Sequence, residues 1–195
     1  MLSLGDLSPT ELQRTLSVPS NLLSHHLNVL ETEGMIVRSR SEADRRRSYV
    51  RLLPGAFEKL VPGGLVQARR VVFVCTANSA RSQLAAALWE RHSDIPVASA
   101  GTHPAQRIEP GAIAAARRHH VPLRASTPRP LADVLLADDF LVSVCDNAYE
   151  ELGEHRGVHW SVPDPVRTAT DEAFDRAFED ISQRVSDLAA RLTAA

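Results

Sequence analysis

Residues 71–82 read VVFVCTANSARS and decide the fold of the larger part of the chain. The first four residues are uniformly apolar, which is typical of a strand buried in a parallel sheet. Residues 83–91 then show the apolar spacing of a helix. A strand, a loop and a helix in this order aim successive backbone N–H groups at an anion. The stretch therefore predicts an oxyanion-binding loop at the carboxyl end of a parallel strand.

Cys75 and Arg81 stand six residues apart in this loop, and each has a clear chemical use there. Backbone N–H groups and the positive end of the following helix both stabilise a thiolate at Cys75, the predicted nucleophile. Arg81 can hold two oxygens of a tetrahedral anion and stabilise the charge of the transition state. Ser82 can donate a hydrogen bond to the Cys75 sulfur, and Asn78 tolerates the left-handed backbone of a tight loop. We expect the oxyanion to be bound by Thr76, Ala77, Asn78, Ser79, Ala80 and Arg81.

Two further segments support this interpretation, because a Cys and an Arg at this spacing also occur around buried structural cysteines. Residues 98–102 (ASAGT) end the next apolar strand, and residues 160–165 (WSVPDP) precede the last helix. Together with the loop, these segments resemble the low-molecular-weight protein tyrosine phosphatase family, and its arsenate reductase branch most closely. The resemblance extends from Val71 to Leu192.

The resemblance implies an α/β fold in which helices flank a four-stranded parallel sheet. It also implies that Asp164 is the general acid that protonates the leaving oxygen. Many tyrosine phosphatases of the family carry an aromatic residue after the Asp-Pro pair, where it stacks on the substrate ring, but Val166 follows here. We therefore expect arsenate reduction, and phosphatase activity on phosphomonoesters or phosphoproteins is the alternative.

Cys145 bears on this choice, because the thioredoxin-coupled arsenate reductases carry a second Cys in the matching place. Their third Cys matches Leu152, so the three-thiol relay is absent.

Three interpretations of Cys145 stay open. Cys145 resolves the Cys75–arsenate adduct, leaving a disulfide for an external reductant such as thioredoxin. A small thiol such as mycothiol or glutathione attacks the adduct, with a glutaredoxin-like partner. Or Cys145 is a buried core residue and the enzyme is a phosphatase. We expect residues 142–148 to form the end of a strand followed by a loop. We expect the enzyme to carry no bound cofactor.

The first 53 residues predict a different unit, made of two helices and two short strands. Ser8 and Pro9 signal a helix start, a second helix is expected from Ser20 to Glu33, and Gly34 ends it. Residues 35–38 and 48–53 then predict an antiparallel pair of strands around an arginine-rich loop. This order is that of a winged helix-turn-helix, whose second helix can enter the major groove of DNA.

Residues 16–40 (LSVPSNLLSHHLNVLETEGMIVRSR) resemble the ArsR-type winged-helix repressors, and residues 42–54 (EADRRRSYVRLLP) are similar to MarR-type regulators. The resemblance implies binding of a double-stranded DNA operator. The alternative is that these residues form an ordinary helix and a solvated loop. The residues expected to face DNA are Asn21, Ser24, His25, Arg45, Arg46 and Arg47.

Such repressors dimerise through helices that flank the core, and we expect a homodimer here. Almost nothing precedes Leu4, so a first helix is lost, the start codon is misplaced, or the second unit supplies the dimer contacts. No cysteine precedes Cys75, so we expect no arsenite sensing through thiols of this module.

Composition limits the remaining functions. The 195 residues are 44% hydrophobic and carry a net charge of −2, which gives no global argument for nucleic-acid or membrane binding. No apolar run approaches the roughly 20 residues that span a bilayer. Two cysteines do not make a disulfide framework, so we expect a reduced, cytoplasmic protein. No set of His, Cys and Asp residues has the spacing of a metal site.

We therefore predict a winged helix-turn-helix DNA-binding module over residues 1–58, a linker over residues 59–69, and a phosphatase or arsenate-reductase-like domain over residues 70–195. A truncated N-terminus of the module is one of the alternatives. The predicted function is that of an arsenate-detoxifying reductase fused to an ArsR-like regulator. A phosphatase is one alternative. A DNA-binding regulator whose second domain only senses an oxyanion or redox state is another.

Overall fold

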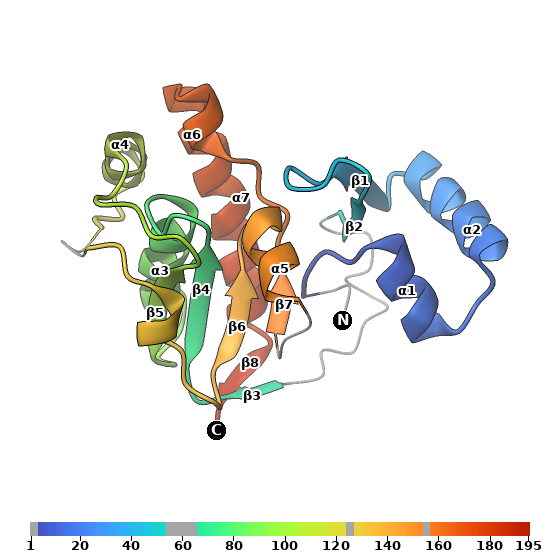
Figure 1. The fold of residues 1–195 in the computed structure, drawn as a ribbon, viewed down its shortest axis with the longest axis horizontal. Helices are drawn as coiled ribbons and strands as arrows, with labels where there is room; N and C mark the ends of the chain where they lie inside the picture. The colour runs from blue at the N-terminus through green and yellow to red at the C-terminus, as the bar shows by residue number, and fades with distance from the viewer. Residues whose placement is uncertain (1–3, 54–65, 124–126, 154–156) are drawn as a thin grey trace. The chain divides into compact units, whose positions relative to one another are not determined.

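The computed structural model describes residues 4–53, 66–123, 127–153 and 157–195. The chain divides into two compact units, residues 1–63 and residues 64–195 (Figure 1). In the described ranges, no helix is both long and apolar enough to cross a membrane.

The first unit opens with α1 (Pro9–Leu16), whose start is fixed by reciprocal capping. The Ser8 hydroxyl accepts from the Glu11 backbone N–H at 3.3 Å, and the Glu11 carboxylate accepts from the Ser8 backbone N–H at 2.6 Å. This pattern satisfies two helix N–H groups that would otherwise lack partners. Pro9 stands at the first helical position, where proline is favoured, so the predicted helix start at Ser8 and Pro9 is confirmed.

Helix α2 (Ser20–Thr32) follows and is succeeded by two antiparallel strands, β1 (Ile36–Arg40) and β2 (Ser48–Leu52). The two helices and two strands appear in the order that the sequence predicts. Leu7 extends the pair as an isolated bridge to Val50. A small apolar core holds these elements together, and its buried members are Leu12, Leu23, Leu27, Ile36 and Val50.

The second unit is built on a parallel sheet of four strands, as predicted. The strands are β4 (Val71–Cys75), β5 (Val97–Gly101), β6 (Phe140–Ser143) and β7 (Gly157–His159), in the order β5-β4-β6-β7. The residues of β4 and β6 are all buried, which explains why both strands are apolar except for Ser143 at the end of β6. Because β4 is central, the loop at its carboxyl end lies between those that follow β5 and β6.

The helices of this unit are α3 (Arg81–His92), α4 (Pro110–Arg118), α5 (Asp146–Leu152), α6 (Pro165–Thr168) and α7 (Asp171–Ala189), with a 3-10 turn over Leu131–Asp133. The longest of them, α7, is amphipathic. Its apolar side is buried, and the core that it joins includes Phe73, Leu84, Trp89, Trp160, Ile181 and Leu188.

A second, small sheet corrects one boundary predicted from the sequence. Strand β3 (Val66–Ala68) pairs in parallel with β8 (Leu192–Ala194). Residues 66–68 therefore belong to the second unit and not to the linker expected over residues 59–69, of which residues 59–65 lie outside the described ranges. Helix α7 ends at Ala189, before β8 begins. Strands of three residues are too short to show a hydrophobic period, and their pairing depends on a partner at the other end of the unit.

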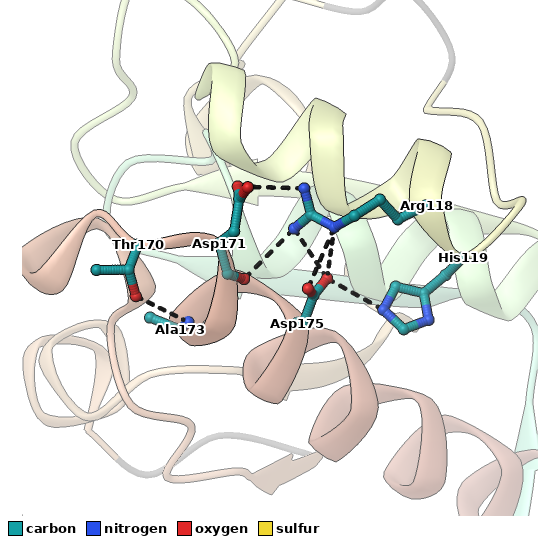
Figure 2. Close-up of polar contacts among 6 residues, drawn as sticks. All are labelled: Arg118, His119, Thr170, Asp171, Ala173 and Asp175. Atoms are coloured by element: carbon teal, nitrogen blue, oxygen red, sulfur yellow. Dashed lines mark hydrogen bonds and ion pairs between the residues drawn. The ribbon is translucent and has the colours of Figure 1, made fainter.

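Helices α4 and α7 are joined by a polar cluster at the end of α4 (Figure 2). The Arg118 guanidinium contacts the carboxylates of Asp171 and Asp175, at 3.1 and 2.9 Å. His119 reaches Asp175 at 3.1 Å, and its ring stacks on Phe178 with ring centroids 4.1 Å apart. Gly111 lets the two helices approach closely, because a Cβ there would meet the Phe174 ring at 2.2 Å.

Candidate active site

The candidate active site is the loop that joins β4 to α3. Strand β4 ends at Cys75 and α3 begins at Arg81. The buried Cys75 sulfur accepts from the Asn78 backbone N–H at 3.2 Å and lies 3.1 Å from the Ser82 hydroxyl. The loop therefore curls over the thiol, and the contact expected between Ser82 and Cys75 is present.

The carbonyl groups of the loop turn outward. Thr76 O accepts from His103 N at 2.8 Å, Ala77 O from Ala105 N at 2.9 Å, and Ser79 O from Glu109 N at 2.9 Å. Within the described residues, no side chain caps α3 at Ala80. Outward carbonyls and an uncapped helix start leave backbone N–H groups for an anion inside the loop.

Asn78 forms several of the hydrogen bonds that hold the loop in place. Its backbone has a φ of 48°, in the left-handed region that the sequence predicted for it. Its side-chain N–H donates to Ser82 Oγ at 2.8 Å, and its side-chain oxygen accepts from the backbone N–H of Arg129 at 2.9 Å and from Gln83 Nε2 at 3.2 Å. Gln83 was not anticipated from the sequence, although it directly follows the motif.

Gly101 has a role that its motif alone did not reveal. It pairs with Cys75 across β4 and β5. A Cβ at this position would lie 2.6 Å from Thr76 O and 3.0 Å from Asn78 N. Both atoms are loop backbone and cannot move aside as a flexible side chain would. Glycine therefore allows the loop to lie directly against the end of β5.

Arg81 brings the distant Asp-Pro segment to the loop. The buried guanidinium donates to Val162 O at 2.9 Å and approaches the Asp164 carboxylate at 3.3 Å. The other carboxylate oxygen of Asp164 accepts from Val166 N at 3.2 Å and so caps α6. The structure thus brings together Cys75, Arg81, Ser82 and Asp164, which lie up to 89 residues apart in the sequence.

Cys145 lies beside the same loop. Ser143, the last residue of β6, pairs with Val74 of β4, so Cys145, two residues further on, lies close to the level of Cys75. Its sulfur is 3.5 Å from Thr76 Oγ1. The predicted strand end is present, but the loop after it is only two residues long, because α5 begins at Asp146. Cys145 caps this helix by accepting from Ala148 N at 3.4 Å. A helix of seven residues is too short for its apolar period to be read from sequence.

The Cys145 thiol is buried, and burial raises its pKa above the ordinary value because a thiolate loses its hydration there. The Arg81 guanidinium opposes this shift, and the neighbouring Cys75 adds to it. Cys75, Cys145 and Arg81 therefore form one electrostatic unit. Over the described ranges, no group of three or more His, Cys, Asp or Glu side chains could hold a metal ion.

The predicted DNA-facing residues lie in the other unit. Asn21, Ser24 and His25 are exposed on α2, and Arg45 and Arg46 are exposed in the loop between β1 and β2. Arg46 is held by Asp44 at 3.0 Å. Arg47 is half-buried, with its guanidinium 5.8 Å from the centre of the Tyr49 ring.

The model of the family described as low molecular weight phosphotyrosine protein phosphatase matches residues 70–195. The chain belongs to this family. The match confirms the family resemblance of the second unit. Because it begins at residue 70, the DNA-binding prediction for residues 1–58 stays a prediction.

Relatives within the low-molecular-weight phosphatase family include reductases. An arsenate reductase of Bacillus cereus (strain ATCC 14579) is 30% identical over 124 residues, which are 60% of this chain and 91% of that protein. The solved arsenate reductase of Archaeoglobus fulgidus is 27% identical, with a TM-score of 0.55, over 62% of this chain and 98% of that one. A tyrosine phosphatase of Escherichia coli K30 has a TM-score of 0.57 over 64% of this chain and 98% of that one, and at 21% identity it shows the fold alone.

Proposed function

We propose that the second unit is an arsenate reductase in which Cys75 is the nucleophile and Cys145 the resolving thiol. The observation that carries the proposal is the position of Cys145, whose sulfur contacts Thr76 of the oxyanion loop at 3.5 Å. A phosphatase needs no second thiol there. The arsenate reductases among the relatives, and Val166 in place of an aromatic residue after Asp-Pro, support the same choice.

In the first step, the Cys75 thiolate attacks arsenic and displaces an oxygen, forming a sulfur–arsenic(V) bond. The loop N–H groups and Arg81 bind the remaining oxygens and stabilise the charge of the transition state. Arg81 contacts Asp164 in the present structure, so the incoming oxyanion competes with Asp164 for the guanidinium. Asp164 then gives a proton to the leaving oxygen, which departs as water.

In the second step, the Cys145 thiolate attacks the Cys75 sulfur. The sulfur–sulfur bond forms, the sulfur–arsenic bond breaks, and its electron pair stays on arsenic. Arsenic(V) is thereby reduced to arsenite, and the two thiols are oxidised to one disulfide. An external thiol reductant must restore the thiols, and thioredoxin is one source; mycothiol or glutathione with a glutaredoxin-like partner is another. No bound cofactor enters these steps.

The test is a single turnover of fully reduced protein with arsenate and no added reductant. We expect close to one arsenite per chain, with loss of both free thiols. Cys75→Ser should abolish arsenite release, and Cys145→Ser should abolish it without preventing capture of the oxyanion. Arsenite formed by Cys75→Ser would overturn the mechanism. No arsenite from the wild type, followed by release on addition of glutathione or mycothiol, would assign the second step to a small thiol.

A phosphatase is the second candidate, and the burial of Cys145 favours it, because an inert core cysteine is also buried. This candidate predicts turnover of p-nitrophenyl phosphate that is unaffected by Cys145→Ser, and no arsenite under any thiol condition.

For residues 1–58 we propose a winged-helix module that binds duplex DNA as a homodimer, joined by a linker to the enzyme in residues 70–195. The exposure of Asn21, Ser24 and His25 on α2 supports this, as do the exposed arginines 45 and 46. Each arginine that contacts phosphate should contribute about one unit to the salt dependence of DNA affinity. Duplex binding that is unchanged by Arg45→Ala at every salt concentration would remove that residue from the interface.

An alternative is a regulator whose second unit only senses an oxyanion or redox state. It predicts operator binding that changes with arsenate or oxidation, together with no arsenite release.

A further inference from the structure

One buried contact between a carboxylate and an imidazole, next to the active site, has no part in the steps above. The carboxylate of Asp146 and the imidazole of His159 approach at 3.0 Å, and their side chains are 3% and 1% exposed. Asp146 directly follows Cys145 and is the first residue of α5. His159 is the last residue of β7, where it pairs with Ser143 of β6. The pair therefore joins the turn that carries the second thiol to the edge strand of the sheet.

The contact ties this turn to β7. A buried carboxylate is costly unless it is paired, so loss of either partner should disturb the start of α5. Tyr149, one helical turn along from Asp146, stacks on the same imidazole, with ring centroids 4.2 Å apart and planes 9° from parallel. Two residues on one side of α5 therefore contact His159, and together they set the position and direction of the helix start.

The position of the Cys145 sulfur depends on that helix start. The sulfur contacts Ala148 N, inside the first turn of α5, and Thr76 Oγ1 in the oxyanion loop. If the first turn shifts, the sulfur loses the first contact and its approach to the loop. The contacts of Cys75 with Asn78 and Ser82 do not involve α5, so they should persist.

We propose that Asp146 and His159 are positioning residues for the second thiol, which aim Cys145 at the Cys75 sulfur and leave the first chemical step alone. The inference rests on the proposed role of Cys145 as the resolving thiol. The Cys145 proton leaves to solvent, the Cys145–Cys75 bond forms, and the bond from Cys75 to arsenic breaks with its electrons on arsenic. Asp146 and His159 exchange no proton or electron with the substrate in this scheme.

The test separates the two steps in Asp146→Asn and His159→Gln. The rate at which iodoacetamide alkylates Cys75, and the protection that arsenate gives, measure the reactivity of Cys75 and oxyanion binding by the loop. Single-turnover arsenite release reports the transfer to Cys145. We expect each variant to slow arsenite release by at least about tenfold, while alkylation and its protection change by less than about twofold. The double variant should be no slower than the single ones, because both remove one interaction.

Asp139→Asn is the matched control. Asp139 is also a carboxylate with 3% exposure, and it pairs with Arg70. Phe140 begins β6 and pairs with Val71 at the start of β4, so Asp139 lies at the opposite end of the strands from Cys75. Its loss should lower thermal stability as much as that of Asp146 and leave both chemical readouts unchanged. If Asp146→Asn slows alkylation and arsenite release together, or if Asp139→Asn reproduces its effect, the pair has only a structural role.

A third readout keeps this inference separate from the function proposed above. The oxidant diamide can join Cys75 and Cys145 without arsenate, and loss of free thiols measures the rate. Slower joining in Asp146→Asn supports positioning even if the wild type makes no arsenite. Equal rates in Asp146→Asn and wild type, by diamide and by arsenate, would overturn the inference while leaving the reductase proposal intact. A wild type that joins its thiols under neither condition overturns both.

Discussion

Asn78 organises the oxyanion loop through a single side chain. The side chain forms hydrogen bonds with the side chains of Ser82 and Gln83 and with the backbone N–H of Arg129. The residue is fully buried, and its backbone lies in the left-handed region. Asparagine is one of the few residues that combines this backbone with donor and acceptor atoms on one short side chain. The loop geometry therefore depends on this residue more than on the side chains of Thr76 or Ser79.

We expect Asn78→Ala to lower kcat/KM on p-nitrophenyl phosphate, and the rate of arsenite release, by on the order of 100-fold. Alanine leaves buried partners without hydrogen bonds and disfavours the left-handed backbone. Steady-state and single-turnover kinetics measure the effect. Asn147→Ala, which truncates an exposed asparagine on α5, is the control and should be close to wild type. Equal activity of both variants would contradict the role given to Asn78.

The raised pKa of Cys145 predicts a pH dependence for its step alone. Because the thiolate is the attacking species and burial raises the pKa, the thiolate fraction at neutral pH is smaller than for an exposed cysteine. Arsenite release in a single turnover should therefore keep rising with pH beyond the ordinary thiol value of about 8.5. Rates followed across pH 6 to pH 10, with Cys75 alkylation as the parallel readout, test this. A plateau of arsenite release below pH 8 would contradict the burial effect.

At the scale of elements, α4 and α7 are joined by ion pairs whose contribution to stability depends on pH (Figure 2). The hydrogen bond from Arg118 lowers the pKa of Asp175 below its ordinary value of 3.8, partial burial opposes the shift, and His119 adds to it. A lowered carboxylate pKa contributes stability above the ordinary value, and this contribution is lost as the pH falls through the folded-state value.

Arg118→Ala should therefore lower the Tm by roughly 2 °C at pH 7, a small effect because the pair is partly exposed. The difference from wild type should shrink as the pH falls below 3.8. Arg117→Ala, which changes an exposed neighbour on α4, controls for the loss of one positive charge. Thermal unfolding at pH 7 and pH 3 measures both. A difference that grows in acid would contradict the assignment of this pair.

The elements also show where sequence reasoning stops. The chemistry of Cys75, Arg81 and Asn78 could be predicted because a buried strand, a tight loop and a helix occur within one continuous segment. Helix α5 could not, because seven residues do not cover two full periods. The contact of Asp146 with His159 joins residues on two elements that the sequence does not pair, and β3 depends on β8 at the far end of the unit. Local pattern predicts local geometry, and pairing between elements requires the fold.

At the scale of the whole molecule, the two units have separate cores and separate predicted chemistries. The core of the first unit is Leu12, Leu23, Leu27, Ile36 and Val50, all before residue 54. The residues of the oxyanion site and the positioning pair all lie in residues 64–195. A unit with its own core and a complete site is expected to fold and act alone.

A fragment of residues 64–195 should therefore release arsenite in a single turnover at a rate within about twofold of the full chain.

A fragment of residues 70–195, cut at the family boundary, lacks β3. It leaves β8 unpaired and exposes the buried Leu192, so its Tm should fall by roughly 5 °C and its tendency to aggregate should rise, because an unpaired strand edge is open to other chains. Thermal unfolding and light scattering compare the two fragments. Equal stability would mean that β3 contributes nothing to the fold, and an inactive but folded 64–195 fragment would mean that the enzyme needs the first unit.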